Sequence, residues 1–177
     1  MQSSKISRRL ALGLVAVALP ALTSCAGSFE AQLQEPYTPG NAVWADTDDL
    51  RVRGVVAVAS TDGAATLVAT ILNEGDADDA LVAIRVPGGR ARIGAGTVPR
   101  STVPLPAGGV AVLGADTTLG EATPVAIESR SVRLGSTVPV VFDFERAGSV
   151  RLNVLVVPRR GEYATVPPPT GMPRTGA

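Results

Sequence analysis

The sequence contains no histidine, and this absence excludes several classes of protein at once. A serine or cysteine nucleophile that relies on histidine as its base cannot be built. Cys25 is the only cysteine, and methionine occurs only at positions 1 and 172. Soft-metal sites need clusters of Cys, His or Met, so the chain cannot assemble such a site from its own residues.

The N-terminal residues have the pattern of a bacterial export signal. Lys5, Arg8 and Arg9 precede an apolar run from Leu10 to Leu19, and no acidic residue lies among them. The run is shorter than the roughly 20 apolar residues that a membrane-spanning helix needs, and it has the length of a signal-peptide core. We therefore expect residues 1–24 to be a signal peptide that is removed on export. Lys5 is the only lysine, so a serine–lysine site is excluded as well.

The segment Leu22-Thr23-Ser24-Cys25 resembles the bacterial lipobox, in which an aliphatic residue and two small residues precede the cysteine. This resemblance implies a lipid-modified cysteine, with diacylglycerol and acyl chains such as palmitate on Cys25. Two or three chains would anchor the protein on the extracytoplasmic face of the plasma membrane, since each buried methylene contributes about 0.8 kcal/mol. The alternative is an ordinary cysteine near a plain secretory cleavage site. Both Sec and twin-arginine export remain open, because Ser7-Arg8-Arg9 matches the latter loosely.

Composition divides the chain into four expected parts. These are the signal peptide (1–24), a lipidated cysteine with a flexible tether (25–45), a domain (46–160) and a Pro-rich disordered tail (161–177). Removal of three of the 16 basic residues with the signal peptide leaves 13 against 16 acidic ones, a formal charge of −3. This charge argues weakly against both nucleic acid and broad anionic lipid as partners, and we expect no nucleic-acid partner. We expect the domain to be monomeric.

Residues 46–160 have the pattern of an all-β domain. Short apolar or alternating runs are separated by turn residues at intervals of about 8–12 residues, which is typical of a sandwich. The expected strands are 50–56, 65–72, 81–86, 90–93, two within 103–113, 124–127, 138–145 and 150–156. The last two should form a hairpin, and 65–72, apolar on both faces, should be central. Pro104 and Pro106 cannot donate to a ladder, so their strand should lie at an edge.

Acidic residues cluster in two of the expected turns: Asp46, Asp48 and Asp49 in one, and Glu74, Asp76, Asp78 and Asp79 in the other. Ca²⁺ takes six to eight oxygen ligands, so one loop alone supplies too few. The preferred interpretation is a pair of solvated strand ends that keep the sheet soluble, with a calcium site as the alternative.

Aromatic residues form only 3% of the chain. A glycoside hydrolase needs two facing carboxylates, and acids at turns without surrounding aromatic residues make a poor sugar site. Trp44 lies where the tether meets the domain. We expect it to cover one end of the core, with a ligand platform as the alternative.

Three segments, 72–82, 105–109 and 138–150, resemble the periplasmic copper chaperone family PCuAC in order and spacing across about 65–157. The lipobox and the Pro-containing tail resemble more closely its actinobacterial, LpqE-like lipoprotein branch. The resemblance implies an antiparallel Greek-key β-sandwich of the cupredoxin or immunoglobulin-like kind.

The copper function of that family is not implied. The family binds Cu(I) with two histidines and two methionines, one His-x-Met pair lying shortly after the Pro-Ala-Gly-Gly segment. The corresponding region here, roughly 122–127, contains neither sulfur nor imidazole. We therefore expect no metal ligand, no cofactor and no catalytic residue.

The leading hypothesis is a non-enzymatic, membrane-tethered binding or scaffold module that docks on an envelope or respiratory-complex protein. It predicts an exposed apolar patch, near the lost copper site. The alternatives are a degenerate copper chaperone that shares a site with a partner in metal delivery to an oxidase, and a hydrolase that uses carboxylates.

Overall fold

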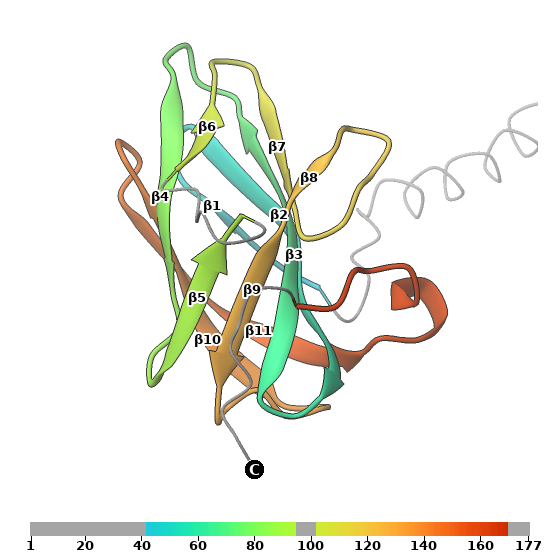
Figure 1. Ribbon diagram of the computed structural model, residues 1–177. Helices are drawn as coiled ribbons and strands as arrows, with labels where there is room; N and C mark the ends of the chain where they lie inside the picture. The colour runs from blue at the N-terminus through green and yellow to red at the C-terminus, as the bar shows by residue number, and fades with distance from the viewer. Residues whose placement is uncertain (1–41, 95–101, 170–177) are drawn as a thin grey trace, which may run out of the picture. The chain divides into compact units, whose positions relative to one another are not determined.

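The computed structural model describes residues 42–94 and 102–169, in which the chain folds almost entirely into β-strands (Figure 1). One turn of 3-10 helix, η1 (Gly161–Tyr163), follows the last strand. None of the described helical residues forms a helix that could cross a membrane. The strands are β1 (Val43–Asp46), β2 (Leu50–Thr61), β3 (Ala64–Asn73), β4 (Asp79–Arg85), β5 (Gly89–Ile93), β6 (Val103–Leu105), β7 (Val110–Leu113), β8 (Ala122–Thr123), β9 (Val125–Ser129), β10 (Thr137–Phe144) and β11 (Ser149–Pro158).

The strands form a curled sheet whose two layers enclose the core. The hydrogen-bonded order is β5-β9-β3-β2-β11-β10-β4-β6, with β1 beside β2, β7 beside β3 and β8 beside β7. We call β1, β2, β3, β5, β7, β8 and β9 the larger layer, and β4, β6 and β10 the smaller layer. Strand β11 belongs to both, because it pairs with β10 and with β2. The expected β-sandwich is confirmed.

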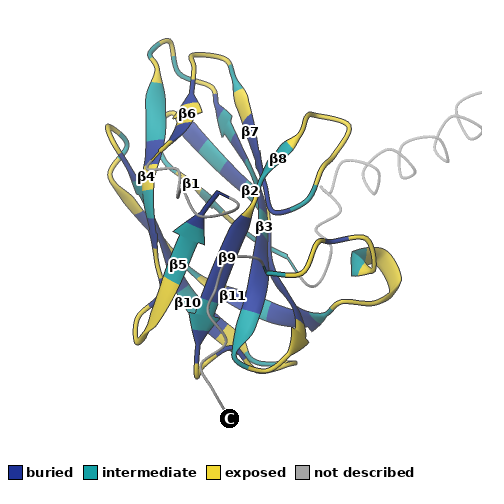
Figure 2. Cartoon of the chain, in the orientation of Figure 1, coloured by how far each residue is buried: buried dark blue, intermediate teal, exposed yellow. Residues whose placement is uncertain are grey.

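The β10–β11 hairpin shows how the sequence pattern builds the core. The two strands pair in continuous antiparallel register from Thr137 opposite Leu155 to Asp143 opposite Ser149, as predicted. Side chains of a strand point alternately to its two faces, so one face of each strand is buried (Figure 2). Their inward residues are Val138, Val140, Phe142 and Phe144 on β10 and Val150, Leu152, Val154 and Val156 on β11.

Within the described residues two strand pairs are parallel, whereas the sequence predicted an antiparallel sandwich. The end of β11 runs parallel to Ala57, Val58 and Ala59 of β2, and β7 runs parallel to β8. Strand β11 pairs with β10 up to Leu155, and from Val156 onward it pairs with β2. This parallel pairing joins the two layers. Other expectations are confirmed: β3 pairs with β2, β7 and β9 and is central, while β6 ends the sheet order.

The first strand differs from the sequence expectation. β1 begins at Val43, inside the segment expected to be a tether, because Val43 and Ala45 pack against the core. Trp44 points away from the core and is 53% exposed. The expectation that Trp44 covers the end of the core is therefore wrong.

The segment after β11 also differs from expectation in the part that the structure describes. Residues 159–169, which we call the C-terminal strap, cross the outer face of the larger layer. Val166 is buried against Val56, Val58 and Val157, and the Thr66 hydroxyl donates a hydrogen bond to the carbonyl oxygen of Pro167 (2.7 Å). Tyr163, Val166 and Pro167 thus contact the sheet, while 170–177 lie outside the described residues.

A close approach of backbones at Gly114 gives a test of the packing. Gly114 has a φ of +81°, and a Cβ there would lie 2.2 Å from the carbonyl oxygen of Leu67. Gly108 has a similar φ of +66° but nothing within 4 Å. We expect Gly114→Ala to lower the free energy of unfolding in urea by about 3 kcal/mol, and Gly108→Ala by about 1 kcal/mol. Equal losses would contradict the close approach.

Candidate functional site

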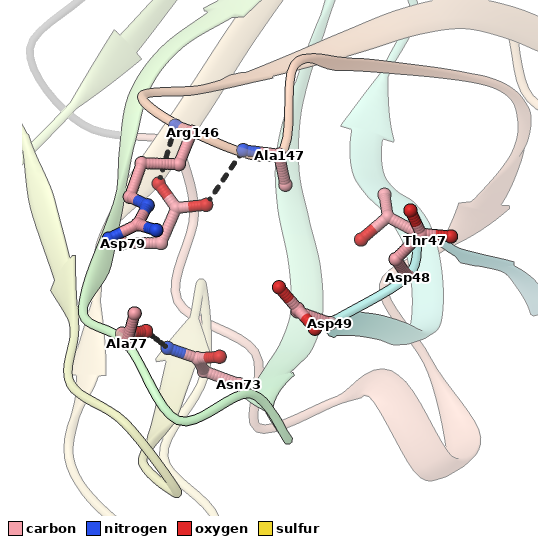
Figure 3. A pocket seen from close by; sticks show the side chains of 8 residues that line it. All are labelled: Thr47, Asp48, Asp49, Asn73, Ala77, Asp79, Arg146 and Ala147. Atoms are coloured by element: carbon pink, nitrogen blue, oxygen red, sulfur yellow. Dashed lines mark hydrogen bonds between the residues drawn. The ribbon is translucent and has the colours of Figure 1, made fainter.

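The two acidic turns lie together at one end of the sandwich and line a cavity of about 370 Å³ (Figure 3). The β10–β11 turn forms the third wall. We call this end of the domain the acidic end. The lining residues are Thr47, Asp48 and Asp49 from the β1–β2 connection, Asn73, Ala77 and Asp79 around the β3–β4 connection, and Arg146 and Ala147 from the hairpin.

Buried Asn73 holds the β3–β4 connection in place. Its Nδ2 donates to the carbonyl oxygens of Ala77 (2.8 Å) and Leu105 (2.9 Å), and its Oδ1 accepts from the N–H of Gly75 (3.1 Å). A buried amide needs such partners, because an unpaired polar group is costly. In the sequence, Asn73 stands out only as part of an Asn-Glu-Gly turn, and nothing else there predicts that it belongs to the site.

Asp79 fixes the third wall of the cavity. Its carboxylate accepts hydrogen bonds from the backbone N–H groups of Ala80 (2.7 Å), Arg146 (3.0 Å) and Ala147 (3.0 Å). Partial burial alone would raise the pKa of Asp79, but the backbone donors favour the charged form, and the net effect lowers the pKa. In Figure 3 the Asp79 carboxylate is directed at the hairpin backbone, whereas Asp49 points into the open space.

The cavity is a hollow lined by three carboxylates and one arginine. Across 42–94 and 102–169, no group of three or more acidic, cysteine or histidine side chains is spaced to hold a metal ion. Asp48 and Asp49 come from one loop, and the Asp79 carboxylate already accepts hydrogen bonds from backbone donors. This arrangement complements a positively charged group from outside the domain.

A second hollow, of about 480 Å³, lies on the smaller layer beside the β4–β5 turn. Arg85 and Arg151 flank Val141 in one row across β4, β10 and β11. The Arg85 guanidinium makes two hydrogen bonds to Asp143, and they lower the pKa of that carboxyl to about 2, with further help from the Ser149 hydroxyl. Arg85 is thus largely neutralised by a partner on its own layer.

Comparison with known proteins identifies the family. A family model described as "Putative lipoprotein LpqE-like" matches residues 48–156. The chain belongs to the LpqE-like family. No curated protein matches the sequence.

Solved structures show that the LpqE-like chain has the fold of PCuAC domains. The metal-free PCuAC domain from PmoF1 is 26% identical over 64% of this chain and 98% of that domain, with a TM-score of 0.51. The metal-free PCuAC domain of PmoF2 is 15% identical over 67% and 98%, with a TM-score of 0.54. The copper-bound form of that domain is 16% identical over 66% and 98%, also with a TM-score of 0.54.

The resemblance to PCuAC proteins led us to expect that residues 122–127 correspond to a copper-ligand pair; in this LpqE-like chain they contribute to the sheet and the core. Residues 122–127 form β8 and the start of β9, and Val125, Ala126 and Ile127 are buried. The carbonyl oxygens of Thr123 and Pro124 accept hydrogen bonds from Gly114 and Gly94. Aliphatic side chains and bonded carbonyls make a poor Cu(I) site.

Cys25, the predicted lipid-bearing residue, lies outside the described residues. Membership of the LpqE-like lipoprotein family agrees with an extracytoplasmic location. The lipid on Cys25 itself stays a prediction.

We predict that Asp79→Asn destabilises the domain and weakens its dependence on acid pH. Because the pKa of Asp79 is lowered in the folded state, its contribution is present above the ordinary carboxyl pKa of 3.8 and is lost as the pH falls through the folded pKa. Urea unfolding at pH 7 and at pH 2 should therefore show a larger loss at pH 7. Asp49→Asn, in the same cavity, should change neither the free energy of unfolding nor its dependence on pH. An equal effect of both variants would contradict this role of Asp79.

Proposed function

We propose that this LpqE-like protein is held on the extracytoplasmic face of the plasma membrane by lipid on Cys25 and acts as a non-enzymatic binding module. It would dock on another protein of the envelope, with respiratory-complex proteins as the partner class that the PCuAC resemblance favours. A fold shared with metal chaperone domains, and a sequence without histidine, support a role in binding rather than catalysis.

The exposed Trp44 is the observation that carries this proposal. It is the only tryptophan of the chain, and it alternates with Val43 and Ala45, which pack inward, so the strand itself holds it toward solvent. Tryptophan contributes more than most residues to the binding energy of interfaces, because a large rigid ring is buried at low entropic cost.

Two further apolar residues lie on the outer face of the larger layer, in the row of β3 and β7 that continues from Arg51 of β2. Leu72 on β3 lies opposite Arg51 on β2 and opposite Val110 on β7, and Val110 is 41% exposed. We call Trp44, Leu72 and Val110 the docking face. Its arginines are neutralised, since Arg51 pairs with Glu74 (3.1 Å) and Arg53 pairs with Asp46.

The docking face borders the region that corresponds to the copper site. Val112, next but one to Val110 on β7, lies opposite Ala122 of β8. Leu119, in the β7–β8 connection, is 62% exposed. An exposed apolar surface of this kind, beside charged turns, is typical of a protein-binding site.

Photocrosslinking tests the docking face. A photoreactive side chain at position 44 or 110 of the full-length protein should crosslink in cells to one and the same envelope protein. The matched control is position 82, since Val82 is also exposed and apolar but lies on the smaller layer. Crosslinking to that protein with equal yield from position 82 would contradict the proposal.

The affinity for the captured partner should depend on the indole. We expect Trp44→Ala to weaken binding by about 30-fold, the change typical of an interface hot spot. Trp44→Phe should lose much less, because it keeps an aromatic ring. Titration calorimetry with the purified partner measures both, and an unchanged affinity for Trp44→Ala would exclude Trp44 from the interface.

Anchoring is tested separately by feeding cells a labelled fatty acid. The wild-type chain should incorporate the label and fractionate with membranes, and Cys25→Ser should lose both properties. Retention of the label in Cys25→Ser would exclude Cys25 as the acceptor.

A second function, a degenerate copper chaperone, is favoured by the likeness to a PCuAC domain that was solved with copper bound. The described residues contain no imidazole or thioether, so a partner would have to supply most of the ligands. Cu(I) binding by the complex with the crosslinked partner, but by neither protein alone, would favour this function.

A further inference from the structure

Acidic and basic residues are equal in number in the sequence, but the fold distributes them unequally between opposite ends of the domain. The acidic end carries eight carboxylates against three arginines; the carboxylates are Asp46, Asp48, Asp49, Glu74, Asp76, Asp78, Asp79 and Glu145, and the arginines are Arg51, Arg53 and Arg146. Among the described residues, the loops and the C-terminal strap at the opposite end carry four arginines against two carboxylates: Arg130, Arg133, Arg159 and Arg160 against Asp62 and Glu162. We call this second group, together with Leu134, the arginine end.

Hydrogen bonds bring three segments together at the arginine end. The N–H of Gly63 in the β2–β3 turn donates to the carbonyl oxygen of Val132 in the β9–β10 loop (2.7 Å). The N–H of Gly135 in that loop donates to Val156 of β11 (2.9 Å). Arg159 is held beside β2 by its N–H, which donates to Ala59 (2.9 Å). The four arginines therefore share one end, although they lie up to 30 positions apart in the sequence.

The β9–β10 loop is braced so that it presents Leu134 to solvent. Val132 is fully buried in the core, whereas Leu134, two residues later, is 45% exposed. The N–H of Leu134 donates to Asp62 (3.0 Å), and the Ser136 hydroxyl donates to the carbonyl oxygen of Arg133 (2.7 Å). Because the loop is already held in one conformation, it loses little conformational entropy when the side chain at its tip is buried in a binding surface.

The arginines of this end are exposed and available to an outside partner. None of the four forms an ion pair with any residue in 42–94 or 102–169, whereas Arg51, Arg53, Arg85 and Arg90 all do. Exposed arginines around a projecting leucine match the chemistry of an anionic lipid surface, where headgroups attract the cations and the acyl region accepts the apolar side chain.

We propose that the arginine end docks on the anionic phospholipid surface and inserts Leu134 at the headgroup boundary. The proposal rests on the membrane anchoring proposed above and adds the orientation of the domain. The charge of −3 expected for the chain without its signal peptide does not oppose docking, because the same membrane repels the acidic end and attracts the arginine end. The acidic cavity would then face away from the bilayer, open to a partner.

The chain length alone does not fix this orientation. The 17 residues between Cys25 and Val43 can span at most about 60 Å, longer than the roughly 40 Å of the 12-residue strand β2. Either end could therefore reach the membrane. β1 runs antiparallel to β2 toward the acidic end, so its first residue, Val43, is the end of β1 nearer to the arginine end. In the proposal, the charges select the arginine end.

The single cysteine permits a test that does not depend on lipidation in the cell. The mature chain, residues 25–177, is coupled through the Cys25 thiol to a maleimide lipid in vesicles of phosphatidylglycerol and phosphatidylcholine. A tryptophan reporter is placed at the arginine end by Trp44→Phe/Leu134→Trp, or at the other exposed leucine by Trp44→Phe/Leu119→Trp. Quenching by lipids brominated on the acyl chains reports which position enters the bilayer.

We expect the reporter at position 134 to be quenched and that at position 119 to stay unquenched. Arg130→Gln/Arg133→Gln should lower the ratio of docked to undocked protein by about 25-fold, or about fivefold per arginine. Arg146→Gln/Arg151→Gln, with the same change in net charge, should lower it little. Quenching at 134 should also vanish in pure phosphatidylcholine.

Equal quenching at 134 and 119, or none at 134, would overturn the proposal and leave an acidic protein surface as the partner of the arginine end. Equal quenching at 134 in neutral and anionic vesicles would overturn the role of the arginines. Failure of Cys25 to accept fatty acid in cells would instead refute the proposed anchor, and it would leave the vesicle result unaffected.

Discussion

Burial of aliphatic side chains between the two layers is the interaction on which the rest of this structure depends. The chain has no intramolecular disulfide available and few aromatic residues, so valine, leucine, isoleucine and alanine fill the core. Fully burying one such branched side chain contributes about 1.5–3 kcal/mol. Strand β11 makes this burial possible, because it pairs with β10 in one layer and β2 in the other and so brings the two layers face to face.

The same topology decides where the charges lie. Each hairpin returns the chain to the end from which it came, so turns that are distant in sequence gather at one end of the sandwich. Acidic turns at 47–49, 74–79 and 145 meet in this way, as do the arginines after β9 and β11. The net charge of the sequence is therefore the sum of two ends of opposite sign. The kind of partner that each end can bind has to be considered separately.

Most of the fold could be predicted from the sequence, because alternation of apolar residues directly reports which face of a strand is buried. The hairpin formed by Val138–Phe144 and Val150–Val156, the edge position of the proline-bearing strand and the central position of 65–72 are of this kind. The parallel pairing of β2 with β11 could not be predicted, since register between distant strands leaves no local pattern. The outward direction of Trp44 could not be predicted, because it follows from the four-residue strand β1. The prolines that precede this strand favoured a tether instead.

The candidate site was predictable only in part. The acidic turns stand out in the sequence, but their meeting in one cavity, and the part played by Asn73 and by backbone donors to Asp79, follow from tertiary contacts. The C-terminal strap over Val56 and Val58 could not be predicted, because a composition rich in proline and glycine is typical of disordered segments. In the structure, one buried valine and one hydrogen bond from Thr66 hold the strap on the sheet.

This LpqE-like chain keeps the PCuAC fold, and we propose that it acts through its surfaces, without a copper site of its own. Titration of residues 26–177 with Cu(I) against a competing chelator tests this proposal most directly. The chelator should retain the copper at every ratio of protein to metal. Tight binding of one copper ion per chain would contradict it, and Met172 and the acidic turns would then be the first residues to replace.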